Sequence, residues 1–143
     1  MKKLSFIAVL ILIVTGCTKK QVLTCDKTEI NDNKLNLSQS VKITFQEDIV
    51  TDVFLESTIK VPEAETVYLE EASDSLEKAM EKYKNRTGIT YKNEKTADSI
   101  KISLKEKMAD ISDSDKQELG INYGKQSMSA VKQGFEEQGF VCK

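Results

Sequence analysis

The sequence predicts an α+β fold in which an antiparallel sheet of about five strands packs against one long helix and one or two shorter helices. Two patterns lead to this prediction. Within residues 35–61, apolar and polar side chains alternate in runs, as in strands that bury one face. Residues 63–86 and 127–138 instead place apolar side chains three and four positions apart, which is the spacing of one face of a helix.

Three strands are expected in the first half of the chain. Residues 21–30 form a short strand that contains Cys25, and the Asn-Asp-Asn run at 31–33 is turn-forming. Residues 35–46 alternate regularly, and residues 53–61 alternate again after a turn at 46–48. Short connections and one apolar face predict an antiparallel meander.

A long helix is expected over residues 63–86, directly after Pro62. Acidic residues crowd its start and basic residues its end, which suits the helix dipole, and Gly88 ends it. Its apolar stripe consists of Leu69, Ala72, Leu76, Ala79 and Tyr83. A fourth strand then begins at Ile89, a turn covers residues 93–98, and residues 100–104 form a fifth strand.

The last part of the chain contains two helix signals. Ser112 is a good N-cap for a short helix that ends at Gly120. A further helix spans residues 127–138, and Gly139 suits the position just after it. Residues 140–142 are expected to be extended.

The chain begins with the features of an export signal. Lys2 and Lys3 precede an apolar stretch from Leu4 to Val14, which is shorter than the roughly 20 residues that span a bilayer. The stretch ends Val-Thr-Gly-Cys, which resembles the lipobox of bacterial lipoproteins. The resemblance implies that residues 1–16 are a lipoprotein signal peptide and that Cys17 carries diacylglycerol. A cleaved signal with Cys17 as an ordinary thiol, or an uncleaved anchor, are the alternatives.

Residues 17–22 would then be the lipidated cysteine and a short tether, and residues 23–143 a single globular domain. Two acyl chains on one cysteine give stable membrane anchoring. The domain would therefore be lipid-anchored through Cys17 at the outer surface of the cytoplasmic membrane.

The two other cysteines predict a disulfide. The chain has three cysteines, and lipidation of one leaves Cys25 and Cys142 in an exported chain, where disulfides persist. This bond would bring the two ends of the domain together. Two free thiols in a redox or metal pair are the alternative, but no C-x-x-C motif and no nearby ligand supports it.

The composition excludes several kinds of function. The chain has no histidine, which rules out Ser-His-Asp and Cys-His catalysis and histidine-ligated zinc. Its net charge is −2 and becomes more negative without Lys2 and Lys3, which argues against a nucleic-acid partner. Asp110, Asp113 and Asp115 do not match a calcium loop, which needs Gly at its sixth and Glu at its twelfth position. No metal site and no cofactor are predicted.

Several segments in this order resemble the small YehR-like lipoproteins of Gram-positive bacteria, an uncharacterised family. They are the lipobox, T-C-D-K at 24–27, S-D-S-D-K-Q-E-L-G at 112–120 and G-F-V-C-K at 139–143. The resemblance covers essentially the whole domain. It implies an exported, lipid-anchored α+β domain and supplies no catalytic residues.

These observations predict a surface lipoprotein with a non-catalytic binding or adaptor domain for an unknown envelope protein or ligand. Phe54 is the candidate binding residue, because it falls on the polar face of its strand between Asp52 and Glu56, although packing under a helix or loop is the commoner fate. The alternatives are a protective, immunity-type envelope lipoprotein and a histidine-free envelope enzyme.

Overall fold

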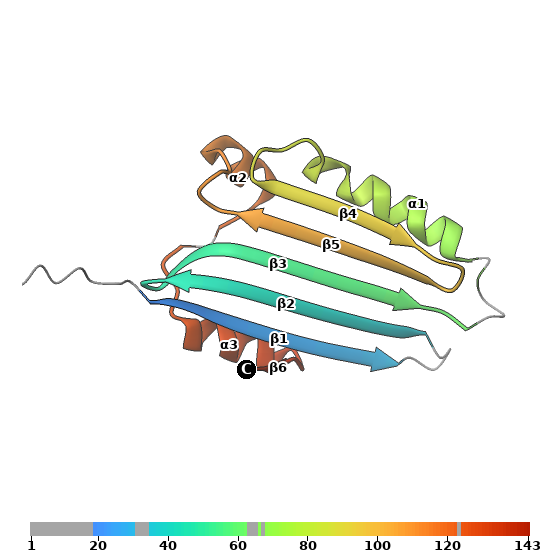
Figure 1. The fold of residues 1–143 in the computed structure, drawn as a ribbon, viewed down its shortest axis with the longest axis horizontal. Helices are drawn as coiled ribbons and strands as arrows, with labels where there is room; N and C mark the ends of the chain where they lie inside the picture. Colours follow the sequence, from blue (N-terminus) through green and yellow to red (C-terminus); the bar gives the residue numbers. More distant parts are fainter. Residues whose placement is uncertain (1–18, 31–34, 63–65, 67, 123) are drawn as a thin grey trace, which may run out of the picture.

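The computed structural model describes residues 19–30, 35–62, 66, 68–122 and 124–143. The predicted signal peptide, Cys17, the turn at 31–33 and the first residues of the predicted long helix lie outside these ranges. Within them the α+β prediction is confirmed: a six-stranded antiparallel sheet packs against three helices (Figure 1).

The sheet has the order β4-β5-β3-β2-β1-β6, and every neighbouring pair is antiparallel. The predicted meander is therefore confirmed for the first three strands, and the extended C-terminal segment forms a short sixth strand at the edge. The strands are β1 (Lys20–Ile30), β2 (Asn36–Gln46), β3 (Ile49–Lys60), β4 (Ile89–Lys95), β5 (Ser99–Lys107) and β6 (Val141–Cys142).

Two strand boundaries differ from the prediction. β3 begins at Ile49, not at 53, because Glu47 and Asp48 make a two-residue turn with φ of 51° and 60°. Such turns usually carry Asn-Gly or Asp-Gly, so this one has a weak sequence signal. β4 continues through Lys95, where a turn was expected, since a strand at a solvated sheet edge can be polar.

The helices are α1 (Tyr68–Met80), α2 (Asp113–Leu119) and α3 (Met128–Glu137). The predicted N-cap of α2 is confirmed: Ser112 Oγ accepts a hydrogen bond from the Asp115 amide at 3.0 Å. The predicted C-terminal end of the long helix is wrong. α1 stops at Met80, a 3₁₀ turn covers Glu81–Tyr83, and Ala79 is exposed, whereas Tyr83 packs against Ile89 and Ile111.

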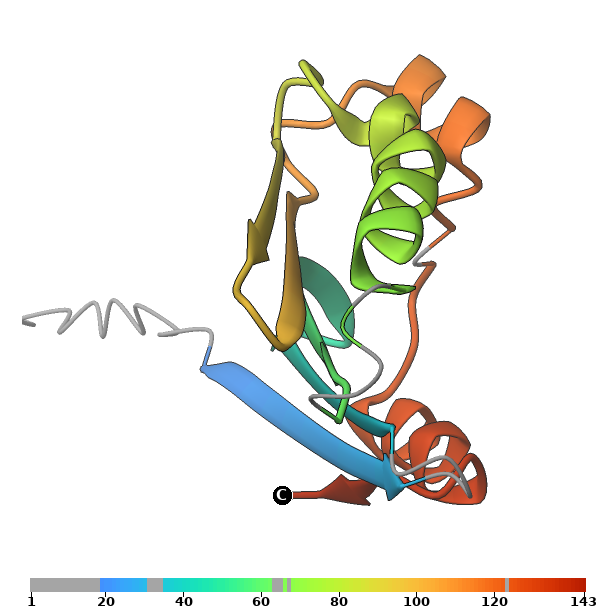
Figure 2. The ribbon, with the colours of Figure 1, turned by 90° about the vertical axis from the view of Figure 1, so that its right-hand side faces the viewer.

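All three helices lie on one side of the sheet (Figure 2). Paired residues of neighbouring strands point to the same side, so the register shows which residues lie beneath the helices. One such row runs Cys25, Val41, Leu55, Leu104 and Tyr91 across the five long strands. We call the opposite, uncovered side the open face; its rows include Thr24, Lys42, Phe54, Lys105 and Thr90.

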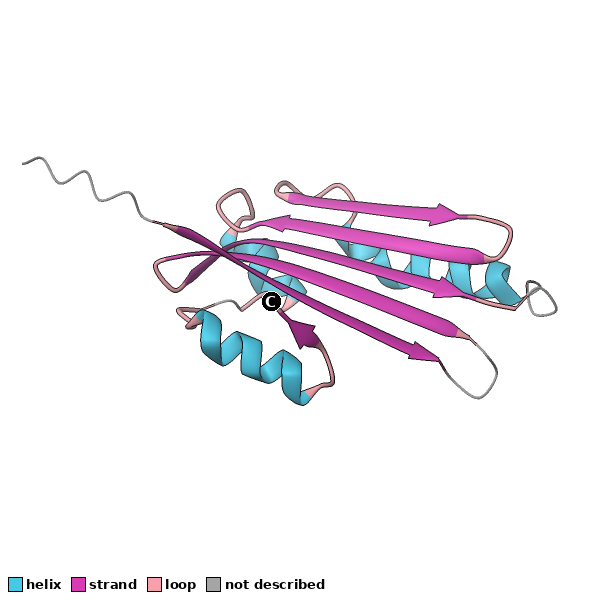
Figure 3. Cartoon of the chain, turned by 60° about the horizontal axis from the view of Figure 1, so that its bottom comes forward, coloured by secondary structure: helices cyan, strands magenta, loops and turns pink. Residues whose placement is uncertain are grey.

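The helices form two separate groups over the sheet (Figure 3). α3 packs on β1 and β2, where Leu23, Ile43 and Phe45 are buried beneath it. α1 packs on β4 and β5, where Leu69 and Ile100 are buried. α2 packs through Leu119 against Ile89 and Ile111. This separation leaves the middle of the sheet less covered than its two sides.

α2 is held to the segment after α1 by one arginine. Arg86 donates from Nη1 and Nη2 to the Glu118 carboxylate at 3.0 and 2.6 Å, and Nη1 also contacts Asp115. Hydrogen bonds from Ser112 and Arg86 lower the pKa of Asp115 below its usual range, and hydrogen bonds from Arg86 lower the pKa of Glu118.

These two lowered pKa values predict acid sensitivity. Both carboxylates favour the ionised form more in the folded chain than in the unfolded chain. Their contribution to the stability of the fold is therefore fully present above the ordinary carboxyl pKa of about 4. This contribution is lost as the pH falls through the lowered pKa values of the folded chain. Urea unfolding between pH 7 and pH 2.5 should therefore show a smaller loss of stability in Arg86→Gln than in the parent chain. An unchanged pH profile in Arg86→Gln, with Lys92→Gln as control, would contradict this.

Gly88 is required where the chain turns into β4. Its φ is +81°, and an added Cβ would lie 2.8 Å from the Asp110 carbonyl carbon and 2.8 Å from Ile111 Cγ1. Gly88→Ala should therefore lower the free energy of unfolding by about 1–3 kcal/mol. The control is Gly134→Ala in α3, where a Cβ meets nothing within 4 Å; it should be neutral or stabilise by up to about 1 kcal/mol. Equal urea midpoints for the two variants would refute the strain.

Candidate functional site

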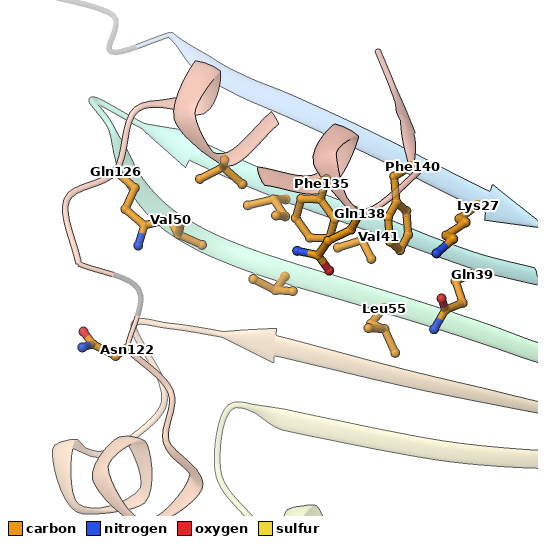
Figure 4. A pocket seen from close by; sticks show the side chains of 13 residues that line it. Lys27, Gln39, Val41, Val50, Leu55, Asn122, Gln126, Phe135, Gln138 and Phe140 are labelled. Atoms are coloured by element: carbon orange, nitrogen blue, oxygen red, sulfur yellow. The ribbon is translucent and has the colours of Figure 1, made fainter. Parts of the chain in front are cut away.

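A groove lies on the helix-covered side of the sheet, where the two helix groups leave β2 and β3 partly uncovered (Figure 4). Its volume is about 470 Å³. α3 forms one wall, and the segment that joins α2 to α3 closes one end through Asn122 and Gln126. The size lies within the usual range of small-ligand sites.

The floor and the α3 wall of the groove are apolar. Phe135 and Phe140 pack edge to face, with ring centroids 5.1 Å apart and an interplanar angle of 80°, which is a favoured aromatic geometry. Leu55 lies at the floor opposite them (Figure 4). The apolar lining consists of Val41, Ile43, Val50, Val53, Leu55, Val131, Phe135 and Phe140.

The rim of the groove is made mostly of side-chain amides, which both donate and accept hydrogen bonds. They are Gln39, Asn122, Gln126 and Gln138. The rim also holds one cation, Lys27, whose Nζ lies 5.6 Å from the centroid of the Phe140 ring and forms an ion pair with Glu29. The groove therefore offers apolar contact at its base and neutral hydrogen-bonding groups at its edge.

The disulfide holds the α3 wall in place. The predicted bond between Cys25 and Cys142 is present, with the two Cα atoms 4.1 Å apart. Both cysteines are buried, and beside them the Thr24 and Lys143 amides and carbonyls exchange hydrogen bonds of 3.0 and 2.9 Å. Because α3 leads directly into β6, this bond fixes the position of the helix that carries Val131 and Phe135.

Phe54, the residue selected from the sequence, lies on the open face, away from the groove. No helix of the described part of the chain covers it, and its side chain is half-buried between Lys42 of β2 and Lys105 of β5, its two register partners. These residues line a second, shallower hollow of about 480 Å³ together with Thr44, Asp52 and Val53. The role of Phe54 in binding stays a prediction.

The described residues hold no cluster of three or more side chains that could bind a metal ion. The carboxylates with lowered pKa values, Asp98, Asp115 and Glu118, belong to surface ion pairs, and none of them lines the groove. One buried carboxylate, Glu106, was not foreseen; it lies on the helix-covered side between Val53 and Ile89 and is 4% exposed. The described residues that line the groove include no pair of carboxylates and no cysteine.

The sequence did not reveal the groove. The apolar side chains of the predicted helix at 127–138 include Met128, Val131 and Phe135, and all three pack against the buried core. The sequence does contain one indication of the groove. The strands β2 and β3 carry more apolar residues than one short helix such as α3 can cover. The gap itself depends on the spacing between helix groups, which no local pattern encodes.

The comparisons with known proteins support the fold alone. No protein-family model matches the chain, and no curated protein matches it. An NMR structure of a protein from Streptococcus pneumoniae TIGR4 has a similar fold, with a TM-score of 0.60 over 100% of this chain and 96% of that one, at 13% sequence identity. No helix among the described residues has the length and apolar character needed to cross a membrane.

Replacing both bridging cysteines by serine (Cys25→Ser with Cys142→Ser) should lower the free energy of unfolding by about 4–5 kcal/mol, because the bond closes a very long loop. The two cysteines are 117 residues apart. Urea unfolding with and without a reducing agent measures this: reduction should lower the midpoint of the parent chain and leave the double variant unchanged. A double variant as stable as the parent would contradict the claim that the disulfide stabilises the fold.

Proposed function

We propose that this protein is a lipid-anchored surface lipoprotein whose domain binds a partner without catalysis. The groove beside α3 carries the proposal, because it combines an apolar floor, an amide rim and the absence of any convergent reactive set among the described residues. The lipobox-like Val-Thr-Gly-Cys at 14–17 supports the anchor. The disulfide supports an oxidising compartment outside the cytoplasm.

The chemistry of the groove favours a short peptide segment with apolar side chains as the ligand. Apolar side chains would contact Val41 and Leu55 at the floor and Phe135 on the α3 wall. The peptide backbone has one donor and one acceptor per residue, and the amides of Gln39 and Gln138 can pair with both. Apart from Lys27, which is paired with Glu29, the rim is neutral and gives little preference for a charged ligand.

A charge at the floor should prevent apolar binding. Leu55→Glu places a carboxylate in the middle of the groove, where an apolar ligand would desolvate it. The probe is the fluorescent dye 8-anilinonaphthalene-1-sulfonate, and its dissociation constant should rise by about tenfold or more, equivalent to about 1.4 kcal/mol. Ser129→Glu, at an exposed position of α3, is the matched control and should leave dye binding unchanged. Equal loss in both variants, or no loss in Leu55→Glu, would reject the groove as the binding site.

The anchor is tested by the intact mass of the protein extracted from its native membrane. The expected mass lacks residues 1–16 and includes diacylglycerol on Cys17. Two alkyl groups should be taken up only after reduction, at Cys25 and Cys142. A full-length or unlipidated mass would refute the anchor, and alkylation without reduction would refute the disulfide in the native protein.

A further inference from the structure

We propose that the open face of the sheet, at the end where β1 begins, lies against the phospholipid surface, so that the groove beside α3 faces away from the membrane. This inference rests on the anchor at Cys17 proposed above. It adds an orientation and a second contact with lipid that the anchor alone does not require.

The first argument is the length of chain before the sheet. β1 begins at Lys20, and a fully extended chain covers at most about 3.6 Å per residue. Lys20 is thus held within about 11 Å of Cys17. Lys20 pairs with Gln46, and Gln46 pairs with Ile49 across the β2–β3 turn. This whole end of the sheet must stay close to the bilayer surface.

The second argument is the placement of the exposed apolar side chains. The large hydrophobic side chains that the described residues expose are Val22, Ile30, Ile49 and Val141. The register places each of them on the open face, opposite Thr44, Asn36, Gln46 and Asp26 respectively. Val22 and Ile49, which are 47% and 52% exposed, lie at the end near Lys20, and Phe54 follows one row further along.

The third argument is charge. Within the described part of the chain, Lys20, Lys42 and Lys105 form no ion pair. Lysines near an anionic lipid surface are attracted to its headgroups. Lys107, also on this face, is paired with Asp110 at 2.7 Å. The acidic side chains near this end are Glu47, Asp48, Asp52 and Asp110, and they are fewer than the lysines, which are Lys19, Lys20, Lys42, Lys105 and Lys107.

Together these features describe an interfacial surface, with apolar and aromatic groups between cationic side chains that reach the headgroups. The shallow hollow around Phe54 is open to the same side. The opposite side of the sheet is covered by α1, α2 and α3 (Figure 2) and exposes none of these four side chains. If the open face lies on lipid, the amide rim of the groove is on the side of the domain that faces away from the membrane, where a partner can reach it.

The test uses the absence of tryptophan from the chain. Phe54→Trp creates a single fluorescent reporter on the open face, and Gln133→Trp creates a matched reporter at an exposed position of α3. Each lipidated, full mature protein is reconstituted into vesicles of phosphatidylglycerol and phosphatidylcholine with or without brominated acyl chains. Residues that bury at the headgroup boundary come within reach of the bromines, so Phe54→Trp should lose at least roughly twice the fraction of emission that Gln133→Trp loses.

A second variant is needed so that the test does not rest on the Phe54→Trp substitution alone. Lys42→Glu with Lys105→Glu, added to Phe54→Trp, should reduce the quenching, and the far-ultraviolet circular dichroism spectrum checks that the sheet is retained. If the proteins float with the vesicles but both tryptophans are quenched equally, the orientation is refuted while the anchor stands. If they do not float, the anchor fails and the orientation with it. A blue shift of Phe54→Trp without bromine quenching would indicate a second copy on this face and would also overturn the proposal.

Discussion

The covalent bond between Cys25 and Cys142 is the constraint on which the rest of the domain depends. It joins the first long strand to the last two-residue strand, which alone has too few hydrogen bonds to stay paired. Because α3 runs directly into β6, its apolar stripe is held over β1 and β2. Without this bond the wall of the groove would be tied to the sheet by side-chain packing and by a few backbone hydrogen bonds, among them the Thr24–Lys143 pair and the bond from the Gln126 amide to the Asp48 carbonyl.

Much of the fold could be predicted from the sequence because its signals are local. The alternation in β2, the Ser112 cap of α2 and the apolar stripe of α3 each follow from the preferences of neighbouring residues. The pairing of Cys25 with Cys142 followed from counting, since one of three cysteines was assigned to lipid. These predictions required no knowledge of how the elements pack.

The features that were missed depend on tertiary context. The polar C-terminal half of β4 is extended because it pairs with β5, which residues 93–95 alone do not encode. The Glu47–Asp48 turn has positive φ angles that neither residue type requires. α1 ends early because Tyr83 leaves the helical path to pack beside Ile89 and Ile111. The groove arises from the distance between two helix groups, and Phe54 could be assigned to the open face from its strand but not to a hollow between two lysines.

The strand order has a consequence for how the chain acquires its structure. β1 is made before the other strands, but its neighbour β6 is made after all of them. Cys25 must therefore keep its thiol available until the strands β2 to β5 and the three helices have emerged, while β2, β3 and β5 can pair earlier. A chain cut between α3 and β6 could still form most of the sheet, but it would lack both β6 and the cross-link. The disulfide therefore locks the sheet only after its other strands have been made.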